Sequence, residues 1–198
     1  MIEIPVLGRA VPRTHGAFVT WFGRLALTVT GWKIEGNFPD CAKFVMIVAP
    51  HTSNWDVPVG LMAKFALRLE CRFIAKHSLF WWPLGMLLRA LGGIPVNRAA
   101  ASDFVDDTVR IFGEREKLVL IITPEGTRAK VARWKSGFHR IARASGVPVV
   151  LVVFDYNRKV VQLGPAFAAT EDYERDLAKI QSHINAAMAK HPERYGQG

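Results

Sequence analysis

Short runs of continuously apolar residues recur along this chain, separated by segments with the spacing of amphipathic helices. The clearest runs cover residues 44–49, 118–123 and 147–154. A half-exposed strand alternates apolar and polar side chains, whereas a strand that is apolar throughout is buried on both faces. Such strands occur mainly in parallel sheets covered by helices. The sequence therefore predicts an α/β fold: a single domain over residues 1–198 with a largely parallel central sheet and helices on both faces.

Helices are expected between these strands and near both ends of the chain. Residues 81–91 are apolar but contain Pro83 and Gly85, which predicts an irregular or helical segment. All the motifs described below lie between residues 44 and 154, which form the predicted core. The expected helices cover residues 17–32, 57–69, 101–114, 137–144 and 170–190, and further short strands are expected at 71–75, 94–96 and 162–163.

Polar residues of unusual type follow three of the predicted strands. These segments are residues 51–56, the pair Asn97-Arg98, and residues 124–128. In open parallel sheets, ligands bind in the crevice outside the carboxyl ends of the strands. The three segments are therefore expected to meet at one edge of the sheet, which makes them the candidate functional site.

The segment PHTSNWD places His51 directly after a buried strand and Asp56 five positions later, at the expected start of a helix. A carboxylate that faces one imidazole nitrogen keeps that nitrogen protonated and leaves the other as a free base. His51 is thus a candidate general base, with Asp56 orienting it. Asp56 has a structural alternative, because aspartate is also a favoured residue at helix N-termini.

The segment TPEGTR, residues 123–128, follows the most strand-like run. Gly126 permits an unusual backbone conformation or a close ligand approach, and Thr127 offers a hydroxyl group. Arg128 carries a planar donor fork suited to phosphate, and Arg98 is a candidate second cation for the same group. Proline, glycine and threonine are also common in simple surface turns, so that alternative stays open.

Other catalytic signatures are missing from the sequence. It has no GxSxG, GxxxxGK[ST], GxGxxG or HExxH motif, and its two cysteines belong to no CxxC pair or Cys/His cluster. No metal is therefore expected. A histidine base near arginines indicates direct transfer to a substrate hydroxyl, with phosphate serving as an anchor.

A net charge of +9 favours a polyanionic partner such as an anionic membrane surface or a phosphorylated substrate. Residues 1–40 are predicted as a helical region that contacts the membrane, because residues 17–32 carry aromatic side chains at helical spacing. An ordinary helix packed on the core would show the same pattern. Arg24 interrupts the segment, which is also short for a membrane span. We expect peripheral attachment at the cytoplasmic face of a membrane.

The motifs together resemble those of the glycerolipid acyltransferases, the lysophosphatidic-acid acyltransferase group. His51 and Asp56 match that family's His-x4-Asp block, and Arg98 in GGIPVNR matches its second block. The turn EGTR, residues 125–128, matches the third, and Val147-Pro148 matches the fourth. The blocks occur in the family order. Asn97 departs from the pattern, because an acidic residue is common there.

The resemblance implies an acyltransferase of phospholipid biosynthesis. The acyl donor would be acyl-CoA or acyl-carrier protein as co-substrate, with no further cofactor, and the acceptor a lysophospholipid, most naturally 1-acyl-glycerol-3-phosphate. His51 would be the general base and Asp56 its orienting partner. The acceptor would be bound by Arg98 and by the turn formed by Glu125, Gly126, Thr127 and Arg128.

The sequence permits two functions other than acyl transfer. A hydrolase could use the same pair to activate water. The protein could instead be a non-catalytic basic protein that binds lipid or nucleic acid. Nucleic acid is disfavoured as the ligand, because the lysines and arginines are spread along the chain and do not form one basic block. Aromatic residues also cluster in apolar contexts such as Phe80-Trp81-Trp82, which suit a membrane or an acyl chain more than base stacking.

Overall fold

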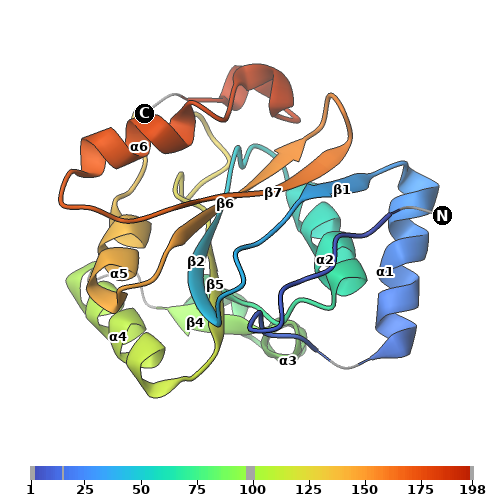
Figure 1. Ribbon diagram of the computed structural model, residues 1–198, viewed down its shortest axis with the longest axis horizontal. Helices are drawn as coiled ribbons and strands as arrows, with labels where there is room; N and C mark the ends of the chain where they lie inside the picture. The colour runs from blue at the N-terminus through green and yellow to red at the C-terminus, as the bar shows by residue number, and fades with distance from the viewer. Residues whose placement is uncertain (1–2, 15, 97–100, 197–198) are drawn as a thin grey trace.

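The computed structural model describes residues 3–14, 16–96 and 101–196 (Figure 1). A seven-stranded sheet runs through the molecule in the order β1-β7-β6-β2-β5-β3-β4. Within this sheet, neighbouring strands are parallel except β6 and β7. The predicted single α/β domain with a largely parallel sheet is thereby confirmed. The strands are β1 (Lys33–Gly36), β2 (Lys43–Val48), β3 (Arg72–Lys76), β4 (Gly93–Val96), β5 (Leu118–Ile122), β6 (Val149–Asp155) and β7 (Val160–Phe167).

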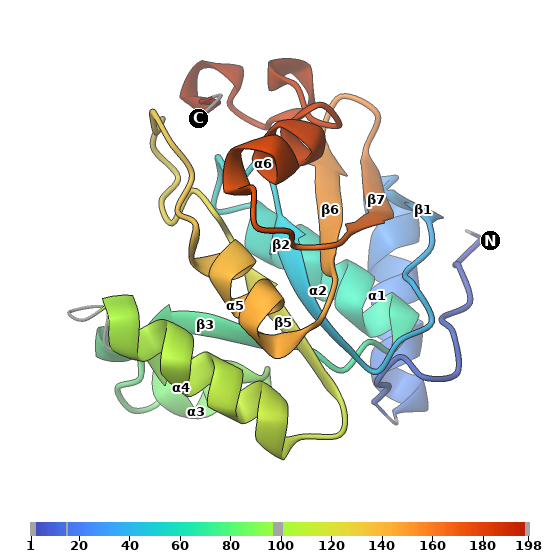
Figure 2. The same ribbon diagram turned by 60° about the vertical axis from the view of Figure 1, so that its left-hand side comes forward.

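Helices cover both faces of the sheet, as expected. Helices α1 and α2 pack on one face, and α4, α5 and α6 pack on the other (Figures 1 and 2). Short 3₁₀ turns occur at His77–Leu79, Ala186–Met188 and Pro192–Arg194. The helices are α1 (Ala17–Thr30), α2 (Asp56–Leu67), α3 (Leu84–Ala90), α4 (Ala101–Glu114), α5 (Gly137–Ser145) and α6 (Tyr173–Gln181).

Strand β2 shows why the predicted strands are apolar throughout. Its side chains alternate between two core clusters: Phe44 and Met46 pack with α1 and α2, whereas Val45 and Ile47 pack with α4, α5 and α6. Both faces of the strand are therefore away from water, and each position is stabilised by an apolar side chain.

Two parts of the chain differ from the sequence expectation. The helix expected over residues 170–190 ends at Gln181, and a 3₁₀ turn follows at Ala186–Met188. The helix gives way to a turn at Ser182 and His183, and Asn185 then caps the 3₁₀ turn by accepting the Ala187 N–H from an extended backbone. Strand β1 was not expected, since only Ile34 of its four residues is buried. The first 40 residues therefore hold a strand as well as the expected helix.

The parallel strands bring three loops to one edge of the sheet. Strand β2 lies between β6 and β5, and all three run in the same direction. The segments that follow them begin at Ala49, Thr123 and Tyr156. This is the edge at which the candidate site was expected.

Candidate functional site

His51 and Asp56 lie together at this edge. The Nδ1 atom of His51 is 2.8 Å from the Oδ2 atom of Asp56. The imidazole is not aligned for a straight hydrogen bond, as is common for catalytic pairs before substrate binds. Asp56 is only 3% exposed, whereas His51 is partly open to solvent. With Nδ1 directed at the carboxylate, Nε2 is the nitrogen that a substrate can reach.

The carboxylate of Asp56 is bonded on both oxygens. Oδ2 accepts the backbone N–H of Ser53 at 3.1 Å, and Oδ1 accepts the Tyr156 hydroxyl at 2.7 Å. Asp56 is the first residue of α2, where the helix dipole favours a negative charge. Its side chain therefore faces His51, Ser53 and Tyr156. Tyr156 was not among the residues expected from sequence, because it lies outside the four motif blocks.

Glu125 lies behind His51 and supports its backbone. Its Oε1 atom accepts the His51 backbone N–H at 3.0 Å, and the residue is only 6% exposed. The Oε2 atom is buried without a hydrogen-bond partner among the described residues. Burial raises the pKa of Glu125 to about 7, and the hydrogen bond from His51 partly offsets this. The Glu125 carboxylate thus joins the loop after β5 to the loop after β2.

The raised pKa of Glu125 has a consequence for stability. Between its ordinary value of 4.5 and about 7, the folded protein holds the proton more tightly than the unfolded chain. The stabilisation from this group is therefore complete below that window and is lost as pH rises through about 7. Glu125→Gln keeps an acceptor for His51 and cannot ionise. As pH rises through this window, the unfolding free energy of the wild type should fall more steeply than that of Glu125→Gln. We expect the two slopes to differ by up to about 1.4 kcal/mol per pH unit.

Urea unfolding followed from about pH 5 to about pH 8 measures this difference. The exposed Glu116, changed to glutamine, is the matched control, and its curve should run parallel to that of the wild type. Parallel curves for Glu125→Gln and wild type would contradict the assignment of a raised pKa to Glu125.

The rest of the turn after β5 divides into a packed and an exposed part. Gly126 has a φ of +67°, and a Cβ there would meet Nζ of Lys135 at 3.2 Å, so glycine suits both the backbone and the space. Thr127 is exposed, and its Oγ1 accepts the Ala129 N–H at 3.3 Å. Arg128 is exposed and forms no ion pair within the described part of the chain, which leaves it available for a ligand.

Arg98, the second expected cation, lies outside the described residues. A shared phosphate clamp formed by Arg98 and Arg128 therefore stays a prediction. The structure brings together the pair His51–Asp56 and the turn that begins with Glu125, whereas Val147-Pro148 lies before β6, at the other end of the strands.

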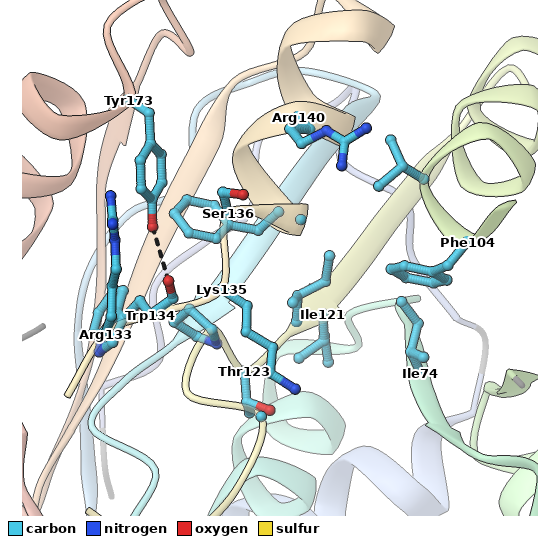
Figure 3. Close-up of a pocket in the computed structure, with 16 residues that line it drawn as sticks. Ile74, Phe104, Ile121, Thr123, Arg133, Trp134, Lys135, Ser136, Arg140 and Tyr173 are labelled. Carbon is cyan, nitrogen blue, oxygen red and sulfur yellow. Dashed lines mark hydrogen bonds between the residues drawn. The ribbon is translucent and has the colours of Figure 1, made fainter. Parts of the chain in front are cut away.

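A cavity of about 540 Å³ opens beside the turn after β5 (Figure 3). Part of its wall is formed by Thr123, Pro124 and Gly126. The cavity therefore borders the residues on both sides of Glu125, which bonds to the His51 backbone. Most of the remaining wall is apolar, and Lys135 adds a cation that points toward Thr123. The apolar part comes from β3, β5, α4, α5 and the loop before α5, and it includes Ile74, Phe104, Ile121, Trp134 and Phe138.

A second histidine–aspartate pair joins α5 and α6. Nε2 of His139 is 2.9 Å from Oδ2 of Asp176, which also accepts the backbone N–H and hydroxyl of Thr170. Burial opposes ionisation, yet the bonds from His139 and Thr170 lower the pKa of Asp176 overall. Both members are about 5% exposed or less, so this pair cross-links α5 and α6 and offers no nitrogen to a substrate.

The described residues contain no group of three or more His, Cys, Asp or Glu side chains arranged to hold a metal ion. Cys41 and Cys71 are free thiols. Burial raises the pKa of Cys71 to about 11, which keeps this thiol protonated and unreactive. The pair His51–Asp56, with its partly exposed imidazole, is the candidate reactive group at this edge.

Comparison with known proteins agrees with this geometry. The family model described as Acyltransferase matches residues 33–155, which run from the start of β1 to the end of β6. This chain belongs to the acyltransferase family. The region that matches contains His51, Asp56 and the whole turn of residues 123–128. Tyr156 is the first residue beyond it.

This acyltransferase-family chain is similar to a 1-acyl-sn-glycerol-3-phosphate acyltransferase of Cocos nucifera, with 32% identity over 106 residues. That match covers 50% of this chain and 31% of the coconut protein, so the chain spans about a third of that relative. The fold resembles the crystal structure of the 1-acyl-sn-glycerophosphate (LPA) acyltransferase PlsC from Thermotoga maritima, with a TM-score of 0.57 and 23% identity. That likeness covers 83% of this chain and 74% of the other.

Proposed function

We propose that this protein transfers a fatty acyl group from a thioester donor to a hydroxyl of a lysophospholipid, with 1-acyl-glycerol-3-phosphate as the favoured acceptor. The observation that carries the proposal is the partly exposed His51 held against the buried Asp56, next to the Glu125 turn that borders a largely apolar cavity. The names of the two similar proteins support the acceptor class.

The geometry supports a general-base mechanism. Nε2 of His51 accepts the proton of the acceptor hydroxyl while that oxygen forms a bond to the thioester carbonyl carbon. The resulting tetrahedral intermediate collapses, the carbon–sulfur bond breaks, and the imidazolium returns the proton to the leaving thiolate. Asp56 stabilises the imidazolium through Nδ1, which it faces at 2.8 Å. No covalent acyl-enzyme is required.

The substrates follow from this chemistry. A thioester is an activated acyl group that a general base alone can transfer, so acyl-CoA or acyl-carrier protein is the donor we propose, with no further cofactor. The apolar wall of the cavity suits a fatty acyl chain. Arg128, exposed at the turn after β5, is the cation we assign to the acceptor phosphate, with Arg98 as its expected partner.

Arg128→Lys should raise the KM for a phosphate-bearing acceptor, because lysine keeps the charge but lacks the planar donor fork. The expected rise is roughly tenfold, with little change in the KM for the donor. Initial rates with each substrate varied in turn measure both constants. Arg115→Lys, at an exposed arginine of the loop between α4 and β5, is the matched control. An equal loss toward an acceptor without phosphate would rule out a phosphate role for Arg128.

Two apolar surfaces are exposed to solvent. Helix α1 contacts α2 through Gly23 and leaves its aromatic face outward, so that face is not part of the core. The other side of the helix, with Leu27, is buried in the core. None of the helices in the described residues is long and apolar enough to span a bilayer. The α1 surface consists of Phe18, Trp21, Phe22, Leu25 and Val29, and the α3 surface consists of Trp81, Trp82, Met86 and Leu87.

We propose that these surfaces attach the protein peripherally to the cytoplasmic face of an anionic membrane. Exposed aromatic side chains enter the interface between headgroups and acyl chains. Each basic residue near an anionic surface adds about 1 kcal/mol to binding, so the net charge of +9 favours such lipids. A lipid acceptor and product require a site that opens at a bilayer.

Replacing Trp21 and Phe22 by serine, or Trp81 and Trp82 by serine, should weaken vesicle binding about tenfold or more. The melting temperature and the activity on a soluble short-chain acceptor should stay near wild type, because these four side chains are more than half exposed. Co-sedimentation with anionic vesicles measures binding, and zwitterionic vesicles and high salt serve as controls. Wild-type protein that fails to bind anionic vesicles at low salt would refute the membrane proposal.

The test of the function itself is an assay with radiolabelled acyl-CoA across several lysolipids and glycerol phosphate. Radiolabelled ester that depends on the acceptor supports transfer. Free fatty acid as the sole product supports the hydrolase alternative, in which His51 activates water. Salt-sensitive DNA binding without either product would support a basic binding protein instead.

A further inference from the structure

We propose that Tyr156 is a positioning residue for the His51–Asp56 pair, and this rests on the proposed acyl transfer. The Tyr156 hydroxyl donates a hydrogen bond of 2.7 Å to Oδ1 of Asp56. The opposite carboxylate oxygen, Oδ2, faces Nδ1 of His51. Tyr156 therefore acts on the base through the carboxylate, and it lies just beyond the region matched by the family model.

The position of Tyr156 is determined by three distant parts of the chain. Tyr156 directly follows β6, and the segment with His51 and Asp56 follows β2. Because β6 and β2 pair in parallel, Tyr156 and Asp56 reach the same edge of the sheet. Its ring packs edge-on against the buried Trp32, with 5.0 Å between ring centres. Its backbone N–H donates to the carbonyl of Met188 at 2.9 Å. The hydroxyl is thereby aimed at Asp56 by contacts that do not involve Asp56.

The C-terminal segment also contacts the other side of the pair. The backbone N–H of His191 donates to Oγ1 of Thr52 at 3.2 Å, and Nη1 of Arg194 donates to the Thr52 carbonyl at 3.5 Å. Thr52 is the residue next to His51. The segment that begins at Met188 therefore bonds to Tyr156, which supports Asp56. It also bonds to Thr52, in the turn that carries His51.

The hydroxyl of Tyr156 has a clear physical task. Asp56 is 3% exposed, and a buried carboxylate must be matched by donors to keep its charge. The Ser53 N–H supplies one such donor at Oδ2, and the Tyr156 hydroxyl supplies the donor at Oδ1. Burial, and then the bond to Asp56, raises the pKa of Tyr156 above the ordinary value for tyrosine, so the hydroxyl remains a donor throughout the neutral range.

Tyr156→Phe tests the role, because it keeps the ring against Trp32 and the backbone bond to Met188. We expect kcat to fall roughly 10- to 100-fold, the effect of a lost hydrogen bond to a charged group, with KM changed by less than about threefold. Tyr195→Phe is the matched control, since it removes a hydroxyl that bonds to the Ile184 carbonyl in the core. Its kcat should stay near wild type.

A double variant separates positioning from a merely structural role. If Tyr156 acts through Asp56, then adding Tyr156→Phe to Asp56→Asn should lower kcat by less than about threefold more. A loss in that background equal to the loss in the wild-type background would overturn the proposal, as would near-normal kcat in Tyr156→Phe.

A readout independent of turnover keeps this test distinct from a failure of the proposed function. The ¹⁵N and ¹H resonances of the His51 ring should shift in Tyr156→Phe and remain in place in Tyr195→Phe. Wild-type protein that transfers no acyl group refutes the proposed function alone. Unmoved His51 resonances in a folded Tyr156→Phe variant refute the positioning role.

Discussion

Replacing His51 with alanine is expected to lower acyl-transfer turnover by roughly 10²- to 10⁴-fold, the usual contribution of a positioned general base. The turn should survive the change, because Glu125 bonds to the backbone N–H of residue 51 and not to its ring. Asp56 also keeps its bonds to Ser53 and Tyr156. The loss should therefore appear in kcat, while equilibrium binding of the phosphate-bearing acceptor stays within about threefold of wild type.

Single-turnover kinetics and acceptor binding to vesicle-free protein measure the two quantities separately. His183→Ala is the matched control, because His183 lies on the surface and contacts Phe167. Added imidazole should restore part of the turnover of His51→Ala, since the vacated space is open to solvent on one side. Near-normal turnover without imidazole would show that another group is the base.

The fold could be predicted well because its signals are local. Strand β2 is apolar at nearly every position, since the cores on both faces of the sheet demand it, and this pattern is visible without any knowledge of neighbours. Strand β1 carries no such signal: Lys33 and Glu35 are exposed, and Ile34 alone is buried. It becomes a strand only because β7 offers it a parallel partner. Its existence is a tertiary effect.

The same distinction separates the predicted site residues from the missed one. His51 and Asp56 are five positions apart, so one strand-to-helix turn is enough to bring them together. Tyr156 is separated from Asp56 by 100 positions, and its contact depends on β6 lying beside β2. A sequence with several apolar strands does not reveal the order of those strands in the sheet. The turn Asp-Tyr-Asn that contains Tyr156 also matches no known motif.

Glu125 illustrates a different limit. Its motif predicted a side chain that binds substrate, and the structure places it in a buried position where it accepts the His51 N–H. A charged residue in a glycine-containing turn is normally exposed, so burial could not be anticipated from composition. A substrate role for Glu125 stays a prediction, and its supporting contact with His51 is what the structure adds.

The second large effect is expected for Asp56→Asn. Two donors meet at Oδ2: the backbone N–H of Ser53, and Nδ1 of His51 in its protonated form. An asparagine should therefore place its carbonyl oxygen there, because its amide would meet the Ser53 N–H donor to donor. The amide then occupies the Oδ1 position and can donate to the oxygen of Tyr156. The variant should fold with a melting temperature close to that of the wild type.

Turnover should nevertheless fall by on the order of 10²-fold or more, because a neutral amide cannot stabilise the imidazolium that forms when His51 takes a proton. Asp56→Ala should lose more and also melt at a lower temperature, since Tyr156 and Ser53 would both face an empty, buried space. Comparing kcat and thermal unfolding of the two variants separates the charge of Asp56 from its hydrogen bonds. If Asp56→Asn kept full turnover, the charge would be irrelevant and Asp56 would serve only as a structural element of the turn.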